Sequence, residues 1–225
     1  VTNLESNGCS YAITSSNTID VFVIANPTLG GASQAATVCA GTGATINLTG
    51  LLPNSTSIIH YTINGVAQTA IPGVVANGAG AASFTSAALT GANNGQTLQI
   101  TQVTNVSMFS PPSCPGPFAV NVTLSVNPTL LASVASISPA AQCANGTVTV
   151  GLSGTAANLP TGAYTVTYSL SAPNTASGLT ATMTVTVAGT GSFTVSGLAN
   201  EGSTTITVTN LESNGCSYAI TSSNT

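Results

Sequence analysis

The two ends of this 225-residue chain carry the same eighteen residues. Residues 1–18 and residues 208–225 both read VTNLESNGCSYAITSSNT, so Val1 matches Val208 and the repeat period is 207 residues. Eighteen consecutive identities do not arise by chance, and self-similarity at a fixed period is the signature of a repeat architecture. The sequence therefore predicts one period plus an overlap, taken from a longer tandem array.

A weaker repeat lies inside the period. Five landmarks recur in the same order at offsets of 101 to 109 residues: the NPTL motif at 26–29 and 127–130, Cys39 and Cys143, Cys114 and Cys216, Tyr61 and Tyr168, and Phe84 and Phe193. Two unrelated β-domains with similar turns would explain this less well than two divergent modules of about 100 residues, a common domain size. We assign residues 1–26 to the last strands of a preceding repeat, 27–127 to module one, and 128–225 to module two, whose last strand is incomplete.

The near absence of charge excludes several functions. The chain has no Lys or Arg, and its acids are Glu5, Asp20, Glu201 and Glu212. A nucleic-acid surface needs cations to neutralise phosphates, and calcium sites need clustered carboxylates. A spanning helix needs about 18 or more consecutive apolar residues, which the sequence lacks. We therefore expect no nucleic-acid partner, no transmembrane span, no metal and no cofactor. A neutral surface favours association between copies.

Short segments in which Thr, Val and Ile alternate with small polar residues predict an all-β chain. The predicted strands cover residues 45–49, 58–64, 83–86, 97–106 and 118–126 of module one, and residues 147–152, 164–170, 181–187, 192–196 and 203–211 of module two. A further strand begins at Tyr218, and the first copy carries it on through residues 19–24. Asn-Gly turns separate several strands. This density of short strands predicts β-sandwiches, with Tyr61 and Tyr168 in the cores and His60 facing outward.

The sequence also resembles a known family. The resemblance rests on TVCAG at residues 37–41, YTING at 61–65, NGCS at 214–217 and the Asn-Pro exits at 26–27 and 127–128. This order is similar to the immunoglobulin-like tandem repeats of giant Bacteroidota surface proteins, which include gliding-type adhesins exported by the type IX route. The resemblance implies tandem immunoglobulin-like β-sandwiches in a rod or fibre at the cell surface. The missing Lys and Arg depart from the pattern of any one adhesin.

The cysteines offer the covalent chemistry of the chain. Cys9 is the earlier copy of Cys216, so each period has four cysteines: Cys39, Cys114, Cys143 and Cys216. Their even number and matched placement predict disulfides formed in an oxidising compartment; no CxxC pair or His cluster supports zinc instead. Pairing within modules would join Cys39 to Cys114 and Cys143 to Cys216.

Topology slightly favours pairing across modules. If each module is entered at one end and left at the other, Cys39 lies at the exit end of module one and Cys114 at its entrance end. A disulfide needs Cα atoms within about 7 Å, whereas a sandwich strand is roughly 20 Å long. Cys39 would then bond Cys216, Cys143 would bond the next copy of Cys114, and the partner of Cys9 would lie outside the chain.

We interpret the chain as a structural repeat of an extracellular fibre or adhesin stalk, without catalytic residues. The expected partners are further copies of the repeat, head to tail and laterally bundled. One alternative is a module whose uncharged Ser, Thr and Asn faces bind a glycan or cell surface. Another alternative is a filament subunit that accepts a strand from a neighbour. The given sequence stops at Thr225, before any counterpart of residues 19–24, so we expect the last strand of module two to be incomplete. An unpaired strand edge of this kind can pair with a donated strand.

Overall fold

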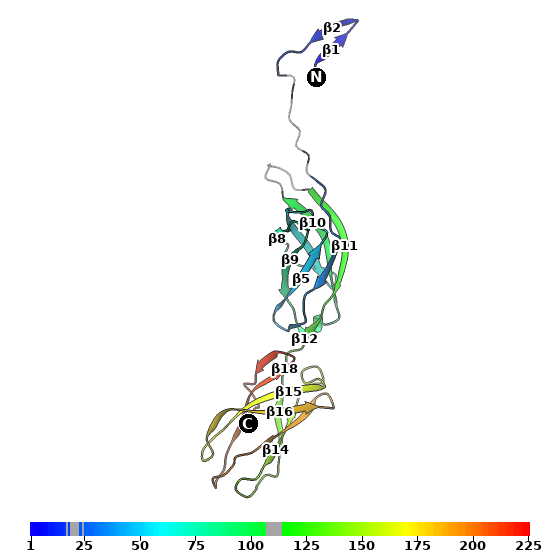
Figure 1. The fold of residues 1–225 in the computed structure, drawn as a ribbon. Helices are drawn as coiled ribbons and strands as arrows, with labels where there is room; N and C mark the ends of the chain where they lie inside the picture. The colour runs from blue at the N-terminus through cyan, green and yellow to red at the C-terminus, as the bar shows by residue number, and fades with distance from the viewer. Residues whose placement is uncertain (17, 19–22, 24, 107–113) are drawn as a thin grey trace.

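A computed structural model describes residues 1–16, 18, 23, 25–106 and 114–225. These residues form β-strands and one short 3₁₀ turn, η1 (Gly91–Asn93). The chain begins with a hairpin, β1 (Asn3–Ser6) and β2 (Cys9–Ala12), and continues into two sandwiches that follow each other along the long axis of the molecule (Figure 1). Within the described ranges, no helix is long and apolar enough to cross a membrane.

The first sandwich packs one three-stranded sheet against a larger sheet. The strands are β3 (Gly31–Gln34), β4 (Val38–Cys39), β5 (Gly43–Thr49), β6 (Thr56–Ile63), β7 (Val66–Ala67), β8 (Ile71–Val75), β9 (Ala82–Ala88), β10 (Thr97–Val106), β11 (Cys114–Thr123) and β12 (Val126–Asn127). One sheet has the order β3-β5-β9, and the other has the order β11-β10-β6-β7 with β8 also on β6. β12 leaves the sandwich in a short parallel pair with β4.

The second sandwich repeats this plan with fewer strands. Its strands are β13 (Ser133–Ser138), β14 (Val148–Ser153), β15 (Gly162–Leu170), β16 (Ala176–Val185), β17 (Thr190–Val195), β18 (Ile206–Ser213) and β19 (Cys216–Ala219). The sheet β13-β14-β17 faces the sheet β16-β15-β18-β19. β13 and β19 are therefore the edge strands on which the chain enters and leaves the sandwich. The all-β sandwich prediction is confirmed.

Each sandwich has its own apolar core, made by strict alternation along the central strands. In β6, Ile59, Tyr61 and Ile63 are buried, while His60 between them is half-buried on the other face. An aromatic pair recurs in both cores: Tyr61 and Phe84 have ring centroids 5.4 Å apart, and Tyr168 and Phe193 also lie 5.4 Å apart. Such pairs add to the stabilisation from buried area. The internal repeat seen in the sequence is thus a repeat of core packing.

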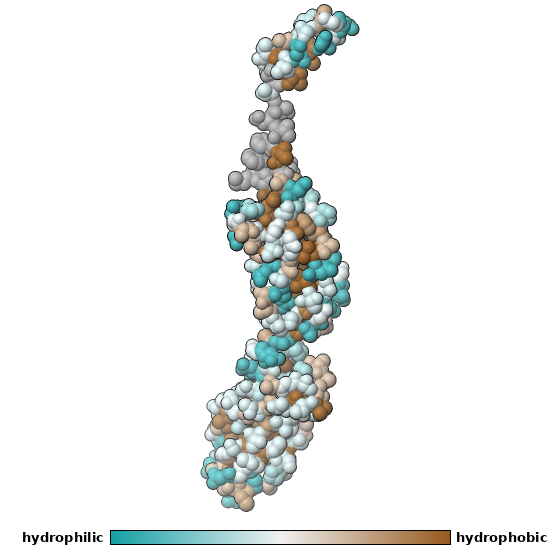
Figure 2. All heavy atoms as spheres, turned by 45° about the vertical axis from the view of Figure 1, so that its right-hand side comes forward, coloured by the Kyte–Doolittle hydropathy of each residue, from teal (hydrophilic) through white to brown (hydrophobic). Residues whose placement is uncertain are grey.

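The outer surface matches the composition. Figure 2 shows weakly polar side chains covering much of both sandwiches, with strongly hydrophilic and apolar ones dispersed among them. The core tyrosines are not part of this surface, and burial raises the pKa of the Tyr164 and Tyr168 phenols above the ordinary value. Both phenols therefore stay neutral near physiological pH.

The predicted strands with strong alternation lie close to the observed ones, and β10 has the predicted bounds. Predictions failed where alternation was weak. The edge strands β3, β4 and β13 and the short strands β7 and β8 were missed, because they are brief or rich in Gly, Ala and Ser. The strand predicted over 203–211 is observed at Ile206–Ser213, and β19 begins at Cys216 rather than Tyr218. The strand predicted over 19–24 falls largely outside the described residues.

The Tyr61 hydroxyl is predicted to stabilise the first sandwich, because its oxygen accepts a hydrogen bond from the Ala87 N–H at 2.8 Å. Tyr61→Phe keeps the ring and leaves this partly buried donor without its acceptor, which costs about 1–3 kcal/mol. Tyr168→Phe is the matched control, since the described residues show no backbone donor to its hydroxyl. Denaturant unfolding should show a clear decrease in the free energy of unfolding for Tyr61→Phe and a smaller decrease for Tyr168→Phe. Equal decreases would contradict a stabilising role for the Tyr61 hydroxyl.

Candidate functional site

The chain leaves the first sandwich beside a cysteine. β12 runs parallel to β4, and this register places Asn127 opposite Cys39. The Ala40 N–H donates to the Asn127 carbonyl at 3.0 Å, and the Gly41 N–H donates to the Leu89 carbonyl at 2.7 Å. The first bond holds the end of β4 against the exit strand, and the second holds the next residue against the end of β9. The sandwich therefore presents two attachment points at the same end, the backbone after Asn127 and the sulfur of Cys39.

A tight hairpin on the second sandwich presents the other cysteine. β18 and β19 are joined at Asn214 and Gly215, whose φ angles are 52° and 74°. Two positive φ values make a type I′ turn, for which Asn-Gly is the favoured sequence because its twist matches that of the strands. Cys216 follows this turn directly as the first residue of β19 and is almost fully buried.

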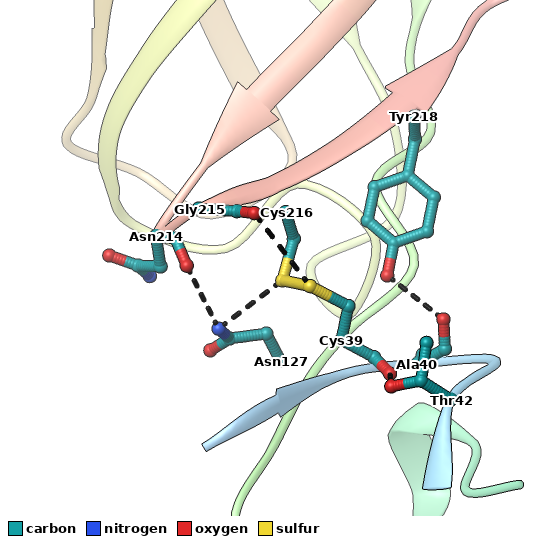
Figure 3. The surroundings of a disulfide bond; sticks show 8 residues. All are labelled: Cys39, Ala40, Thr42, Asn127, Asn214, Gly215, Cys216 and Tyr218. Atoms are coloured by element: carbon teal, nitrogen blue, oxygen red, sulfur yellow. Dashed lines mark hydrogen bonds between the residues drawn. A yellow bond between two sulfur atoms is a disulfide. The ribbon is translucent and has the colours of Figure 1, made fainter. Parts of the chain in front are cut away.

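A disulfide between Cys39 and Cys216 joins the two sandwiches (Figure 3). The two Cα atoms lie 5.6 Å apart, although the residues are 177 positions apart in sequence. Beside the bond, the Tyr218 hydroxyl donates to the Ala40 carbonyl at 3.2 Å, and the Asn127 amide donates to the Asn214 carbonyl at 3.4 Å. The junction thus combines the backbone, a second covalent link and hydrogen bonds between the sandwiches.

The structure therefore adopts the cross-module pairing and does not form Cys39–Cys114 or Cys143–Cys216. The reason is topological. Cys114 begins β11, at the end of the first sandwich remote from β12 and β4 (Figure 1). Cys143 is exposed and lies between β13 and β14, toward the far end of the second sandwich, and Cys9 is exposed in the first hairpin. The pairing of Cys143 with the next copy of Cys114 stays a prediction.

The described residues contain no group of three or more His, Cys, Asp or Glu side chains that could hold a metal ion. The chemistry that the junction offers is covalent and mechanical. It closes a loop that contains most of both sandwiches, and the side-chain amide of Asn127 lies 3.4 Å from the Cys216 sulfur.

A scan of protein-family models finds no match to the chain, and a search of curated proteins finds none. Among solved structures, a marsupial T cell receptor is similar over 87% of this chain and 70% of its own, with 10% identity and a TM-score of 0.44. The tandem Ig repeats of Dlar are similar over 88% of this chain and 95% of theirs, with 9% identity and a TM-score of 0.26. At these identities the likeness concerns the fold alone.

Removing the disulfide is predicted to loosen the junction without unfolding either sandwich. Each sandwich has its own core, and the bond joins no two strands of one sandwich. In the variant Cys39→Ser/Cys216→Ser, small-angle X-ray scattering should show a broader distribution of overall lengths, while circular dichroism keeps its β-sheet signal. Cys143→Ser is the control, because its thiol is exposed and outside the junction. Unchanged scattering in the double variant would contradict a restraining role.

Proposed function

We propose that this chain is a structural repeat of an extracellular fibre or stalk and that the Cys39–Cys216 bond transmits tension between its two ends. The observation that carries the proposal is the connectivity of the bond. A pull on the two ends travels from the N-terminus to Cys39, crosses to Cys216 and leaves along β19. The residues between the two cysteines lie in a closed loop outside the covalent path of the load.

This arrangement limits how far the chain can lengthen. The loop spans a sequence separation of 177 residues, and an extended chain gains about 3.3–3.6 Å per residue. Unfolding both sandwiches in a chain without the bond would add roughly 600 Å of contour length, while the intact bond withholds that length. A spacer that must keep its reach under tension benefits from this, since unfolding of the inner strands cannot lengthen it.

The repeat would place a disulfide of the same kind at each junction of an array. Cys9 occupies the repeat position of Cys216 and would bond the residue equivalent to Cys39 in the preceding repeat. Cys143 would bond the residue equivalent to Cys114 in the following one. Every junction would then have a backbone connection and a disulfide, so head-to-tail copies would form a stiffened rod. Disulfides persist in oxidising surroundings, which supports an extracellular location, and the small number of charges on the surface supports lateral bundling.

A glycan-binding or surface-binding module is the second function considered. Sugar sites commonly use exposed aromatic rings, but Tyr61, Tyr164, Tyr168, Phe84 and Phe193 are buried in the cores. Tyr11 is exposed, yet its repeat counterpart Tyr218 contacts Ala40 of the neighbouring sandwich. The described residues therefore favour the structural role.

Single-molecule force spectroscopy tests the proposal. With the chain held by its ends, the oxidised protein should show no unfolding step as long as a whole sandwich. Cys39→Ser/Cys216→Ser should show two steps of roughly 300–350 Å each, as expected for about 100 residues at 3.3–3.6 Å. Cys143→Ser should behave like the parent protein. If the oxidised parent lengthens as much as the double variant, the load does not pass through the bond and the proposal fails.

A further inference from the structure

We propose that a groove along the edge of the second sandwich is the seat of one more β-strand, with the sequence of residues 19–24, Ile-Asp-Val-Phe-Val-Ile. The groove of about 340 Å³ lies between β13 and the start of β18. Ile137, Thr204 and Ile206 line it, and the same three residues also line an adjoining groove of about 530 Å³. Together they make one trough that leads toward the end of the sandwich where Cys143 lies.

Both walls of the trough are strand edges with backbone available for pairing. β13 is the outer strand of its sheet. On the other wall, β19 pairs only with the later half of β18, from Asn210 to Ser213. Ile137 in β13 is 45% exposed although it faces Val150 of the core strand β14. An apolar side chain and two strand edges that are only partly paired are features that an added strand would cover.

The last described residues already lead into this trough. The Val134 N–H donates to the Ser223 carbonyl at 2.9 Å, and the Val208 N–H donates to the Asn224 carbonyl at 2.8 Å. The tail is therefore held between β13 and β18, and Thr225 itself lines the groove. A strand that continued from Thr225 would therefore start inside the trough.

The first sandwich shows what the completed arrangement looks like. There the Val38 N–H donates to the Ser125 carbonyl at 3.2 Å, and the parallel pair of β4 and β12 follows. Val134 and Ser223 make a backbone bond of the same kind in the second sandwich, at a different repeat position and farther from the cysteine. Residues Val122, Leu124 and Val126 of the first sandwich are buried on the inner face of the strand that closes it. The second sandwich has the start of the same closure and an open trough in place of the rest.

The repeat supplies the strand that fits. Thr18 occupies the repeat position of Thr225, and residues 19–24 follow it. When the Asn-Pro exits are aligned, Val21 and Val23 match the buried Val122 and Leu124, whereas Asp20 matches the exposed Asn121. The single acidic residue of the segment would therefore face water, and its valines would face the core.

The sequence spacings of the two segments also match. Nine positions separate Val134 from Cys143, and nine separate Asn17, the repeat counterpart of Asn224, from Asn26. A strand running parallel to β13 and onward would bring the Asn-Pro exit level with Cys143, as Asn127 lies opposite Cys39 in the first sandwich. The adjoining groove also contains the side-chain amide of Gln142, whose buried nitrogen and oxygen have no hydrogen-bond partner among the described residues. A strand backbone there would offer both a donor and an acceptor.

The experiment compares this chain with the same chain extended after Thr225 by IDVFVIANP, the residues that follow Thr18. The extension should raise the melting temperature of the second sandwich by at least about 5 °C and should slow amide exchange in Val134–Ser138 and Thr204–Ile206. Ile137→Ser should destabilise the extended chain more than the shorter one, because only a seated strand covers Ile137. The first sandwich is an internal control and should not change.

Variants of the extension separate seating from a general effect of added residues. The change Val21→Asp, made in the appended copy, places a charge on the inner face and should abolish the gain, whereas Asp20→Asn on the outer face should keep it. An unchanged melting temperature and exchange pattern would overturn the proposal, as would equal gains with both variants. A gain that grows with protein concentration would overturn seating within one chain and show strand exchange between copies. The seat can exist whether or not the array carries load, so its failure leaves the force experiment unaffected.

Discussion

The bond between Cys39 and Cys216 is the constraint on which the arrangement of the sandwiches depends. A single backbone crossing at Asn127 would leave the second sandwich free to swing, because one covalent point restricts no direction of bending. The disulfide adds a second crossing one strand away, where β4 lies parallel to β12. The hydrogen bond from Tyr218 to Ala40 lies beside it. The junction has this second crossing because strands that are distant in sequence end at the same place.

The inner and outer strands of each sandwich have different roles. The inner strands, such as β5, β6 and β10 in the first sandwich, form the core through alternating apolar side chains. The outer strands make the connections: β4 and β12 at the end of one sandwich, β13 and β19 at the edges of the next. Cysteines and Asn-Pro steps occur on these outer strands or just beyond them. A chain with few charged residues and many small ones can thus combine an ordinary apolar core with a disulfide at its edge strands.

The sequence predicted the inner strands well and the outer strands poorly. β6 and β15 alternate over eight or nine residues, so their faces follow directly from the side-chain period of a strand. β4 has two residues and β13 is mostly small and polar, so neither has a pattern to detect. The candidate site could be predicted only in part, for the same reason. The cysteines and their two possible pairings could be identified, but the choice between them depended on which ends of two folded sandwiches meet.

The duplicated segment shows which structural features depend on nearby residues and which depend on the tertiary structure. Residues 3–12 and 210–219 have the same sequence and form the same hairpin, with Ser6 opposite Cys9 and Ser213 opposite Cys216. That register follows from the sequence alone, because Asn-Gly turns at both places have positive φ angles. Burial does not follow from it: Leu4 is 60% exposed and Leu211 is 0% exposed. In the second copy, β15 pairs with β18 and Leu211 joins the core of the sandwich, whereas the first hairpin pairs with no other strand among the described residues. Cys216 likewise forms a disulfide because the neighbouring sandwich places Cys39 beside it. Backbone turns are decided by nearby residues, whereas burial and disulfide pairing depend on surfaces that the rest of the chain provides.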